Sequence, residues 1–265
     1  MKRMAGAGAA AMLAAASLAG CGSTDGGAPS DASPGRTKVT VFAAASLKNT
    51  FESFEKEFEA KNPDIDVVFT FAGSQDLVTQ MDGGAPADVF ASASKKWMDT
   101  AESKNLVSSS PRIFARNSLE IAVAEGNPKK VTGLDDLASR PELVVVRCAS
   151  EVPCGALTDK VLMAAGDPKI DFDTEQNSVT DTLGLVKAGE ADVAFVYETD
   201  VASAPEKVDG LEIPEAESLA NEYPIAVTVE AQKAKRSEAA QKFVDYVLGD
   251  DGQKALAEAG FQKGE

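Results

Sequence analysis

The chain has 265 residues, of which 44% are hydrophobic, and its formal net charge at pH 7 is −16. This length and apolar content allow one large domain or two lobes with real hydrophobic cores. The negative charge argues against nucleic acid as a partner, because phosphate backbones attract Lys and Arg. The chain contains no histidine, which excludes Ser-His-Asp and Cys-His catalysis.

Residues 1–20 have the pattern of an export signal. Lys2 and Arg3 precede an apolar run that is shorter than the roughly 20 residues of a membrane-spanning helix. Small residues then lead to Cys21 in a pattern that resembles a bacterial lipobox, so we expect Cys21 to be acylated and to anchor the chain outside the cytoplasmic membrane. A plain signal peptide with an incidental cysteine is the alternative. Residues 21–37 are rich in Gly, Ser, Pro, Ala and Asp, which predicts a flexible tether.

Two strand-to-helix turns that follow the tether carry a serine. Residues 39–42 form a predicted buried strand that turns into a helix at Ser46, and residues 65–70 precede a similar turn at Ser74. A helix N-terminus presents free backbone N–H groups and the positive end of the macrodipole, and an N-cap serine adds a hydroxyl. The two turns therefore predict a seat for a small oxyanion. The simpler interpretation is that each serine only caps its helix.

The rest of the chain alternates short apolar strands with helices, which predicts an α/β fold with mainly parallel strand pairing. The further expected strands cover residues 88–91, 119–124, 143–147, 193–197 and 223–229. The expected helices are one through Phe51 that ends before Asn62, and others at residues 77–81, 95–103, 134–138, 155–165, 178–188, 237–248 and 253–259. We expect Asp88, between a turn and a strand, to have a structural role, because a carboxylate would repel an oxyanion.

Cys148 and Cys154 lie close together in the sequence, separated by Ala-Ser-Glu-Val-Pro. In a cell-surface protein we expect them to form a disulfide, which would pin the loop between a strand and the next helix. Two free thiols are the first alternative. A metal site on the cysteine pair is the second, and the absence of histidine counts against it.

Several motifs in register closely resemble the molybdate-binding proteins of bacterial ABC importers. The motifs are VFAAASL at 41–47, FAGS at 71–74, GAPADVFASA at 84–93, WM at 97–98, VPCG at 152–155, SVT at 178–180, VAFVY at 193–197 and EYPIAV at 222–227. The resemblance implies a type II periplasmic-binding fold, with two α/β lobes, a central cleft and two hinge crossovers. The family pattern assigns residues 38–116 plus 224–265 to lobe one and residues 117–223 to lobe two.

The resemblance also implies which residues hold the oxygens of the bound ion. They are Ser46, Ser74, Cys154, Val179 and Tyr197, the first two and the tyrosine through hydroxyls and the others through backbone N–H groups. The family more often has an alanine-like residue at Cys154, and a backbone donor tolerates this change. It often has serine where this chain has Gly73, so one secondary donor is expected to be missing. Without the resemblance, Tyr197 and Val179 would be interpreted as an ordinary core tyrosine and an ordinary helix start.

The function implied by the resemblance is that of a solute-binding protein, not an enzyme, which captures molybdate or tungstate and needs no cofactor. The expected partners are an ABC permease with its ATPase and, through Cys21, the membrane, with the chain acting as a monomer. Alternatives are another oxyanion such as sulfate or phosphate on the same fold, ferric iron, a secreted hydrolase and a structural surface lipoprotein. The absence of histidine and of a Gly-x-Ser-x-Gly elbow counts against the hydrolase. Ferric iron would need a richer set of Tyr, His or carboxylate ligands.

Overall fold

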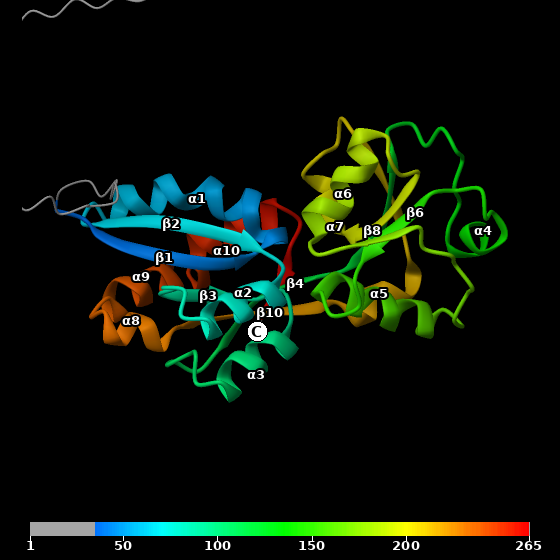
Figure 1. The fold of residues 1–265 in the computed structure, drawn as a ribbon. Helices are drawn as coiled ribbons and strands as arrows, with labels where there is room; N and C mark the ends of the chain where they lie inside the picture. Colours follow the sequence, from blue (N-terminus) through cyan, green and yellow to red (C-terminus); the bar gives the residue numbers. More distant parts are fainter. Residues whose placement is uncertain (1–34, 265) are drawn as a thin grey trace, which may run out of the picture. The chain divides into compact units, whose positions relative to one another are not determined.

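The computed structural model describes residues 35–264, so the expected export signal, Cys21 and most of the tether lie outside it. The described part contains a six-stranded sheet in the order β11-β4-β10-β3-β1-β2 and a five-stranded sheet in the order β7-β6-β8-β5-β9, both covered by helices (Figure 1). We call the two parts the six-stranded lobe and the five-stranded lobe. Between residues 35 and 264, no helix combines the length and apolar character that a membrane span requires.

The elements of the two lobes have the following bounds. The six-stranded lobe contains β1 (Thr37–Ala44), η1 (Ala45–Leu47), α1 (Lys48–Lys61), β2 (Ile65–Ala72), α2 (Ser74–Asp82), β3 (Val89–Ala91), α3 (Lys95–Ser103), β4 (Arg112–Asn117), β10 (Asn221–Val227), α8 (Val229–Lys233), α9 (Ser237–Leu248), α10 (Asp250–Glu258) and β11 (Gln262–Lys263). The five-stranded lobe contains β5 (Leu119–Ala124), α4 (Leu134–Ser139), β6 (Val145–Cys148), α5 (Pro153–Ala164), β7 (Thr174–Gln176), α6 (Val179–Ala188), β8 (Val193–Tyr197), α7 (Glu198–Ala202), β9 (Val208–Glu212) and η2 (Pro214–Leu219).

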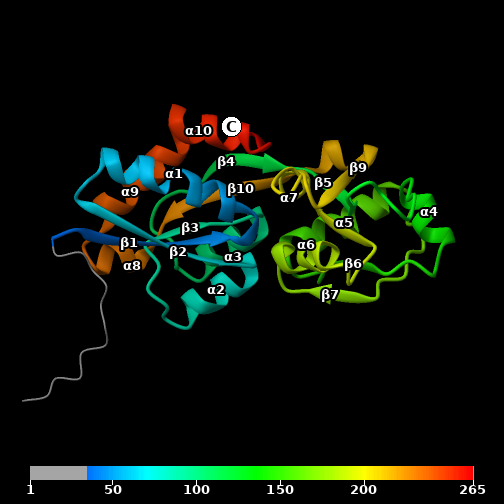
Figure 2. The ribbon, with the colours of Figure 1, turned by 90° about the horizontal axis from the view of Figure 1, so that it is seen from above.

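The central strands of the six-stranded sheet bury side chains on both faces, as continuous apolar runs such as that of β1 require. Val41 belongs to a core that includes Phe51 and Phe58 of α1, whereas its neighbour Phe42 packs in a separate cluster with Leu77 of α2. Helices α1, α9 and α10 therefore cover one face of the sheet, and α2 and α3 cover the other (Figure 2). This arrangement holds the strand ends, and the turns that follow them, in fixed positions.

The strand pairing is mixed, so the prediction of mainly parallel pairing is wrong. β1 is parallel to β2 and β3, and β6 is parallel to β7 and β8. β10 is antiparallel to β3 and β4, and β5 is antiparallel to β8 and β9. The reason is the connection between the sheets. The chain passes directly from β4 into β5 through Ser118 and returns after η2 into β10, so each linking strand enters its new sheet without the crossover helix that parallel pairing needs.

Asp88 has the structural role that we predicted. Its side chain is fully buried and accepts hydrogen bonds from Arg236 Nε at 2.9 Å and from the Thr40 backbone N–H at 2.9 Å. The carboxylate thus joins the start of β3 to β1 and to the turn before α9. It neutralises the guanidinium charge of Arg236 inside the six-stranded lobe.

We expect Asp88→Ala to lower the free energy of unfolding by about 2–3 kcal/mol. This is less than the loss of about 3–5 kcal/mol for a fully buried pair, because Arg236 is partly exposed. Urea denaturation measures the change. Asp99→Ala is the matched control, since Asp99 pairs with Lys95 on the surface and should contribute at most about 1 kcal/mol. Equal losses in the two variants would contradict the structural role of Asp88.

Candidate functional site

The five residues predicted to bind the ion line one cavity between the two lobes. The cavity is lined by Ala44, Ala45, Ser46, Gly73, Ser74, Ala93, Val152, Pro153, Cys154, Val179 and Tyr197. These residues come from the ends of β1, β2, β3 and β8 and from the first turns of η1, α2, α5 and α6. The sequence pattern therefore brings the predicted set together, and its role in binding stays a prediction.

The two serines contribute from the six-stranded lobe, but neither is the N-cap that we predicted. Ser46 lies inside η1, and its Oγ is 2.9 Å from the hydroxyl of Tyr223. Ser74 is the first residue of α2 after the N-cap Gly73, and its Oγ accepts the Ala93 backbone N–H at 3.0 Å. Because this oxygen already accepts a bond, the hydroxyl proton of the fully buried Ser74 is available to donate to a ligand.

The five-stranded lobe contributes the starts of two helices. α5 begins with Pro153, which has no N–H, so Cys154 supplies the first backbone donor of its opening turn. α6 begins at Val179 after Ser178, whose Oγ accepts the Asp181 N–H at 3.2 Å. The first N–H groups of a helix have no intrahelical acceptor and carry the positive end of the macrodipole. Both helices thus direct partial positive charge toward the cavity.

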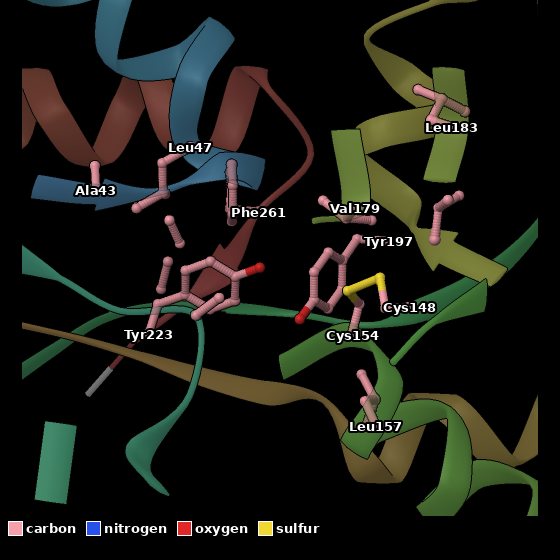
Figure 3. Packing of buried hydrophobic residues seen from close by; sticks show 14 of the residues in the cluster. Ala43, Leu47, Cys148, Cys154, Leu157, Val179, Leu183, Tyr197, Tyr223 and Phe261 are labelled. Atoms are coloured by element: carbon pink, nitrogen blue, oxygen red, sulfur yellow. A yellow bond between two sulfur atoms is a disulfide. The ribbon is translucent and has the colours of Figure 1, made fainter. Parts of the chain in front are cut away.

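A disulfide and a close backbone contact hold the start of α5. Cys148, the last residue of β6, is bonded to Cys154, with the two Cα atoms 5.8 Å apart (Figure 3). A Cβ on Gly155 would lie 2.0 Å from the carbonyl oxygen of Ala149, so only glycine allows this approach. The guanidinium of the buried Arg147 donates to the carbonyls of Cys148 and Gly155. The loop that presents the Cys154 N–H is therefore fixed from three sides.

Tyr197 presents its hydroxyl from the end of β8. The side chain is 1% exposed, and its oxygen accepts the Nδ2–H of Asn221 at 2.9 Å, which leaves the hydroxyl proton available. Burial raises the pKa of Tyr197 above its ordinary value, so the hydroxyl stays protonated and acts as a donor. Its ring lies against that of Tyr223, with centroids 6.0 Å apart (Figure 3).

Three residues connect this site to β4 and β10, the strands of the six-stranded sheet next to the passages between the sheets. The sequence analysis did not assign any of the three to the site. Tyr223 bonds to Ser46, and Asn117 at the end of β4 donates to Tyr223 OH at 3.3 Å and to Thr199 Oγ1 at 2.7 Å. Asn221 at the start of β10 holds Tyr197. The EYPIAV motif that contains Tyr223 was the one available signal, and it did not indicate a contact with Ser46.

The cavity is small, and none of its lining side chains is charged. The space open to the centre of a water-sized sphere is about 10 Å³, whereas pockets for drug-sized organic ligands have about 300–1,000 Å³. The cavity is therefore far smaller than a site for a drug-sized organic ligand. Hydroxyl and backbone N–H donors can stabilise an anion by hydrogen bonding, and no carboxylate in the lining repels it. Among the described residues, no group of three or more Cys, Asp or Glu is placed to hold a metal ion.

A buried, uncharged cavity at the junction of two α/β lobes, surrounded by helix N-termini, defines a solute-binding protein of the periplasmic-binding class. The chain belongs to the family of bacterial extracellular solute-binding proteins, which matches residues 39–262. The predicted fold class is thereby confirmed.

The chain is similar to oxyanion-binding proteins of two kinds. The chain is 40% identical over 254 residues to the molybdate-binding protein ModA of Mycobacterium tuberculosis, which covers 96% of this chain and 95% of that protein. The periplasmic molybdate-binding protein of Azotobacter vinelandii has a TM-score of 0.68 at 21% identity and covers 84% of this chain and 98% of that chain. The sulfate-binding protein SubI of M. tuberculosis has a TM-score of 0.74 at 19% identity, with coverages of 86% and 87%. At these lower identities the likeness shows the shared fold alone.

Proposed function

We propose that this chain captures molybdate, and tungstate equally, outside the membrane and delivers it to an ABC importer. The observation that carries the proposal is the 40% identity, over nearly the whole chain, to a molybdate-binding protein. The neutral cavity with its convergent donors supports it, because the five residues expected from the resemblance all line that cavity.

The ion is held by neutral donors. The hydroxyls of Ser46, Ser74 and Tyr197 and the N–H groups of Cys154 and Val179 donate to its oxygens. A hydrogen bond to a charged group contributes about 1.5–3 kcal/mol, and several together offset the desolvation of a dianion.

Selection among oxyanions follows from size in this proposal. Molybdate and sulfate are dianions of the same shape, and molybdate has the longer bonds to oxygen. Donors fixed on helix starts cannot follow a smaller ion inward without losing hydrogen-bond geometry. Tungstate, nearly the same size as molybdate, keeps that geometry.

The rest of the chain supports delivery at the membrane. Residues 1–20 act as an export signal, and acylated Cys21 anchors the protein through the tether of residues 21–37. We assign residues 38–116 plus 224–265 to lobe one and residues 117–223 to lobe two; β4 and β10, at whose ends the chain passes between the sheets, cross this division. The protein acts as a monomer without catalysis. In support of that view, the hydroxyl of Ser46 faces that of Tyr223 instead of a general base.

Calorimetric titration of the chain lacking residues 1–21 with molybdate, tungstate, sulfate and phosphate tests the proposal. We expect tight binding of molybdate and tungstate alone. At a hundredfold excess over Kd, each bound ion should add about 2.7 kcal/mol to the free energy of unfolding. Comparable affinity for sulfate would overturn the choice of ion, and silence with all four ions would overturn the function.

A further inference from the structure

Two side chains in helices of the six-stranded lobe, those of Gln75 and Trp97, donate hydrogen bonds to backbone carbonyls of the five-stranded lobe. We propose that Gln75 and Trp97 help to hold the two lobes closed on the bound ion, and that Gly73 makes room for this closure. Asn117 and Asn221, on the strands where the chain passes between the sheets, also bond to the five-stranded lobe, at Thr199, Pro153 and Tyr197. The inference rests on the proposed function and adds to it the residues that set how long the ion stays bound.

Trp97 makes the first of the two contacts. It lies in α3, and its Nε1–H donates to the carbonyl of Glu151 at 2.8 Å. Glu151 stands three residues before Cys154, in the loop that the disulfide to Cys148 closes. The hydrogen bond therefore joins α3 to the loop that leads to Cys154, whose backbone N–H is a proposed donor to the ion. Trp97 is also the single tryptophan of the chain.

Gln75 makes the second contact on another ion-binding segment. It lies in the first turn of α2, directly after Ser74, and its side chain is largely buried. Its Nε2–H donates to the carbonyl of Asn177 at 2.9 Å, and Asn177 stands two residues before Val179. A carbonyl acceptor fixes which end of the amide faces it. Each proposed backbone donor of the five-stranded lobe thus has a cross-lobe bond within three residues.

Gly73 explains how α2 and the Asn177 loop approach so closely. A Cβ at this position would lie 2.5 Å from the carbonyl oxygen of Asn177 and 2.3 Å from the Gln75 amide nitrogen. The backbone of Gly73 has φ −58° and ψ 142°, which any residue adopts, so the contact and not the conformation requires glycine. A serine at this position would collide with the opposite lobe in this arrangement. In this chain the side-chain amide of Gln75 occupies that space and donates its hydrogen bond to Asn177.

These contacts act on the closed arrangement only. When the lobes separate, both donors and both carbonyls exchange their partners for water, so the bonds add nothing to the open form. Loss of either bond therefore shifts the equilibrium toward the open form and speeds ion release. Encounter of the ion with the open form does not involve these bonds, so the association rate stays unchanged.

The experiment compares the release of radiolabelled molybdate, chased with unlabelled molybdate, from the wild type and from Gln75→Met, Trp97→Phe and Gly73→Ala. We expect Gln75→Met and Trp97→Phe to raise the release rate by about 2- to 10-fold each. Gly73→Ala should raise it by about 5- to 100-fold, because its Cβ keeps the lobes apart. Gln75 and Trp97 do not line the cavity, so in Gln75→Met and Trp97→Phe the association rate and the melting temperature of the ion-free protein should stay at wild-type values.

Two matched variants serve as controls. Gln241→Met removes a partly exposed glutamine that, within the described part of the chain, donates to Asp245 in its own helix α9. Gly184→Ala adds a Cβ in α6 that meets no described atom within 4 Å. Both should release molybdate at the wild-type rate. Wild-type release rates in Gln75→Met and Trp97→Phe, or slower association with unchanged release, would overturn the inference while leaving the proposed function intact. A wild type that binds none of the four oxyanions would overturn both.

Discussion

Replacing both Ser46 and Ser74 with alanine is expected to weaken molybdate binding by about 10²–10⁴-fold. Each serine supplies one hydroxyl donor to the ion, and a hydrogen bond to a charged group contributes about 1.5–3 kcal/mol. Two such losses correspond to that range, since about 1.4 kcal/mol is tenfold in Kd. The remaining donors lie on the opposite lobe and on helix starts, so they cannot move to replace the hydroxyls. Calorimetric titration gives the change directly.

The control for this double variant is a buried serine of the same lobe that does not line the cavity. Ser92 is fully buried, donates to the carbonyl of Ser94 at 2.9 Å and accepts its N–H at 3.2 Å. Ser92→Ala therefore loses stability through buried hydrogen bonds, as Ser74→Ala does by leaving the Ala93 N–H unpaired. It should keep wild-type affinity. Wild-type affinity in the double variant would show that the hydroxyls are not donors to the ion.

The sequence predicted the positions of these serines but not their local bonds. The strand-to-helix pattern depends on residues that are neighbours in the chain, so the turns after β1 and β2 could be found from periodicity alone. An N-cap requires the side chain to turn back onto its own helix. Ser46 and Ser74 instead form hydrogen bonds with Tyr223 of β10 and with the backbone of Ala93, in the segment after β3. Such partners depend on tertiary packing, and local pattern cannot reveal them.

The same limit explains why the supporting residues were missed. Asn117 and Asn221 stand at the two places where the chain passes between the sheets, and each bonds to a tyrosine of the site. Asparagine in a strand is ordinarily a sign of a strand end or turn, so nothing in the sequence distinguished these two. Tyr223 was expected only as part of a strand. The role of these residues becomes apparent only in the folded chain, where Asn221 bonds to Tyr197 of β8 and Tyr223 bonds to Ser46 of η1.

Asp200, in α7, is a further residue that the sequence did not single out, and it gives the second prediction. The side chain is more than nine-tenths buried, and its Oδ2 accepts the backbone N–H of Tyr197 at 3.1 Å. Burial raises the pKa of Asp200 from 3.8 to about 7, and the single backbone bond lowers it only in part. Lys48, Lys187 and Glu258 line the pocket of about 640 Å³ that Asp200 also borders. Within the described residues Lys48 pairs with Glu52, and neither lysine forms an ion pair with Asp200.

The sign of the pH effect follows from this raised pKa. The folded state holds the Asp200 proton more tightly than the unfolded state, so the stability from this group is complete below pH 3.8 and is lost as pH rises through about 7. Between pH 4 and pH 8 the loss amounts to about 4 kcal/mol. Asp200→Asn keeps an acceptor for the Tyr197 N–H and removes the charge. The variant should therefore be more stable than the wild type at pH 8, with the difference vanishing toward pH 4.

The difference in stability between wild type and Asp200→Asn reports on Asp200 alone, although other carboxyl groups also have a raised pKa. Burial, with the charges of Glu198 and Glu212, raises the pKa of Glu120 to about 7 as well, but Glu120 is present in both proteins and cancels in the difference. Urea denaturation at pH 4, 6 and 8 measures that difference. A constant difference across this range would mean that Asp200 is charged in the folded state at every pH tested. In that case a negative charge would lie directly behind Tyr197, whose backbone N–H bonds to Asp200. The residues that line the cavity would still be uncharged, but their immediate surroundings would not be.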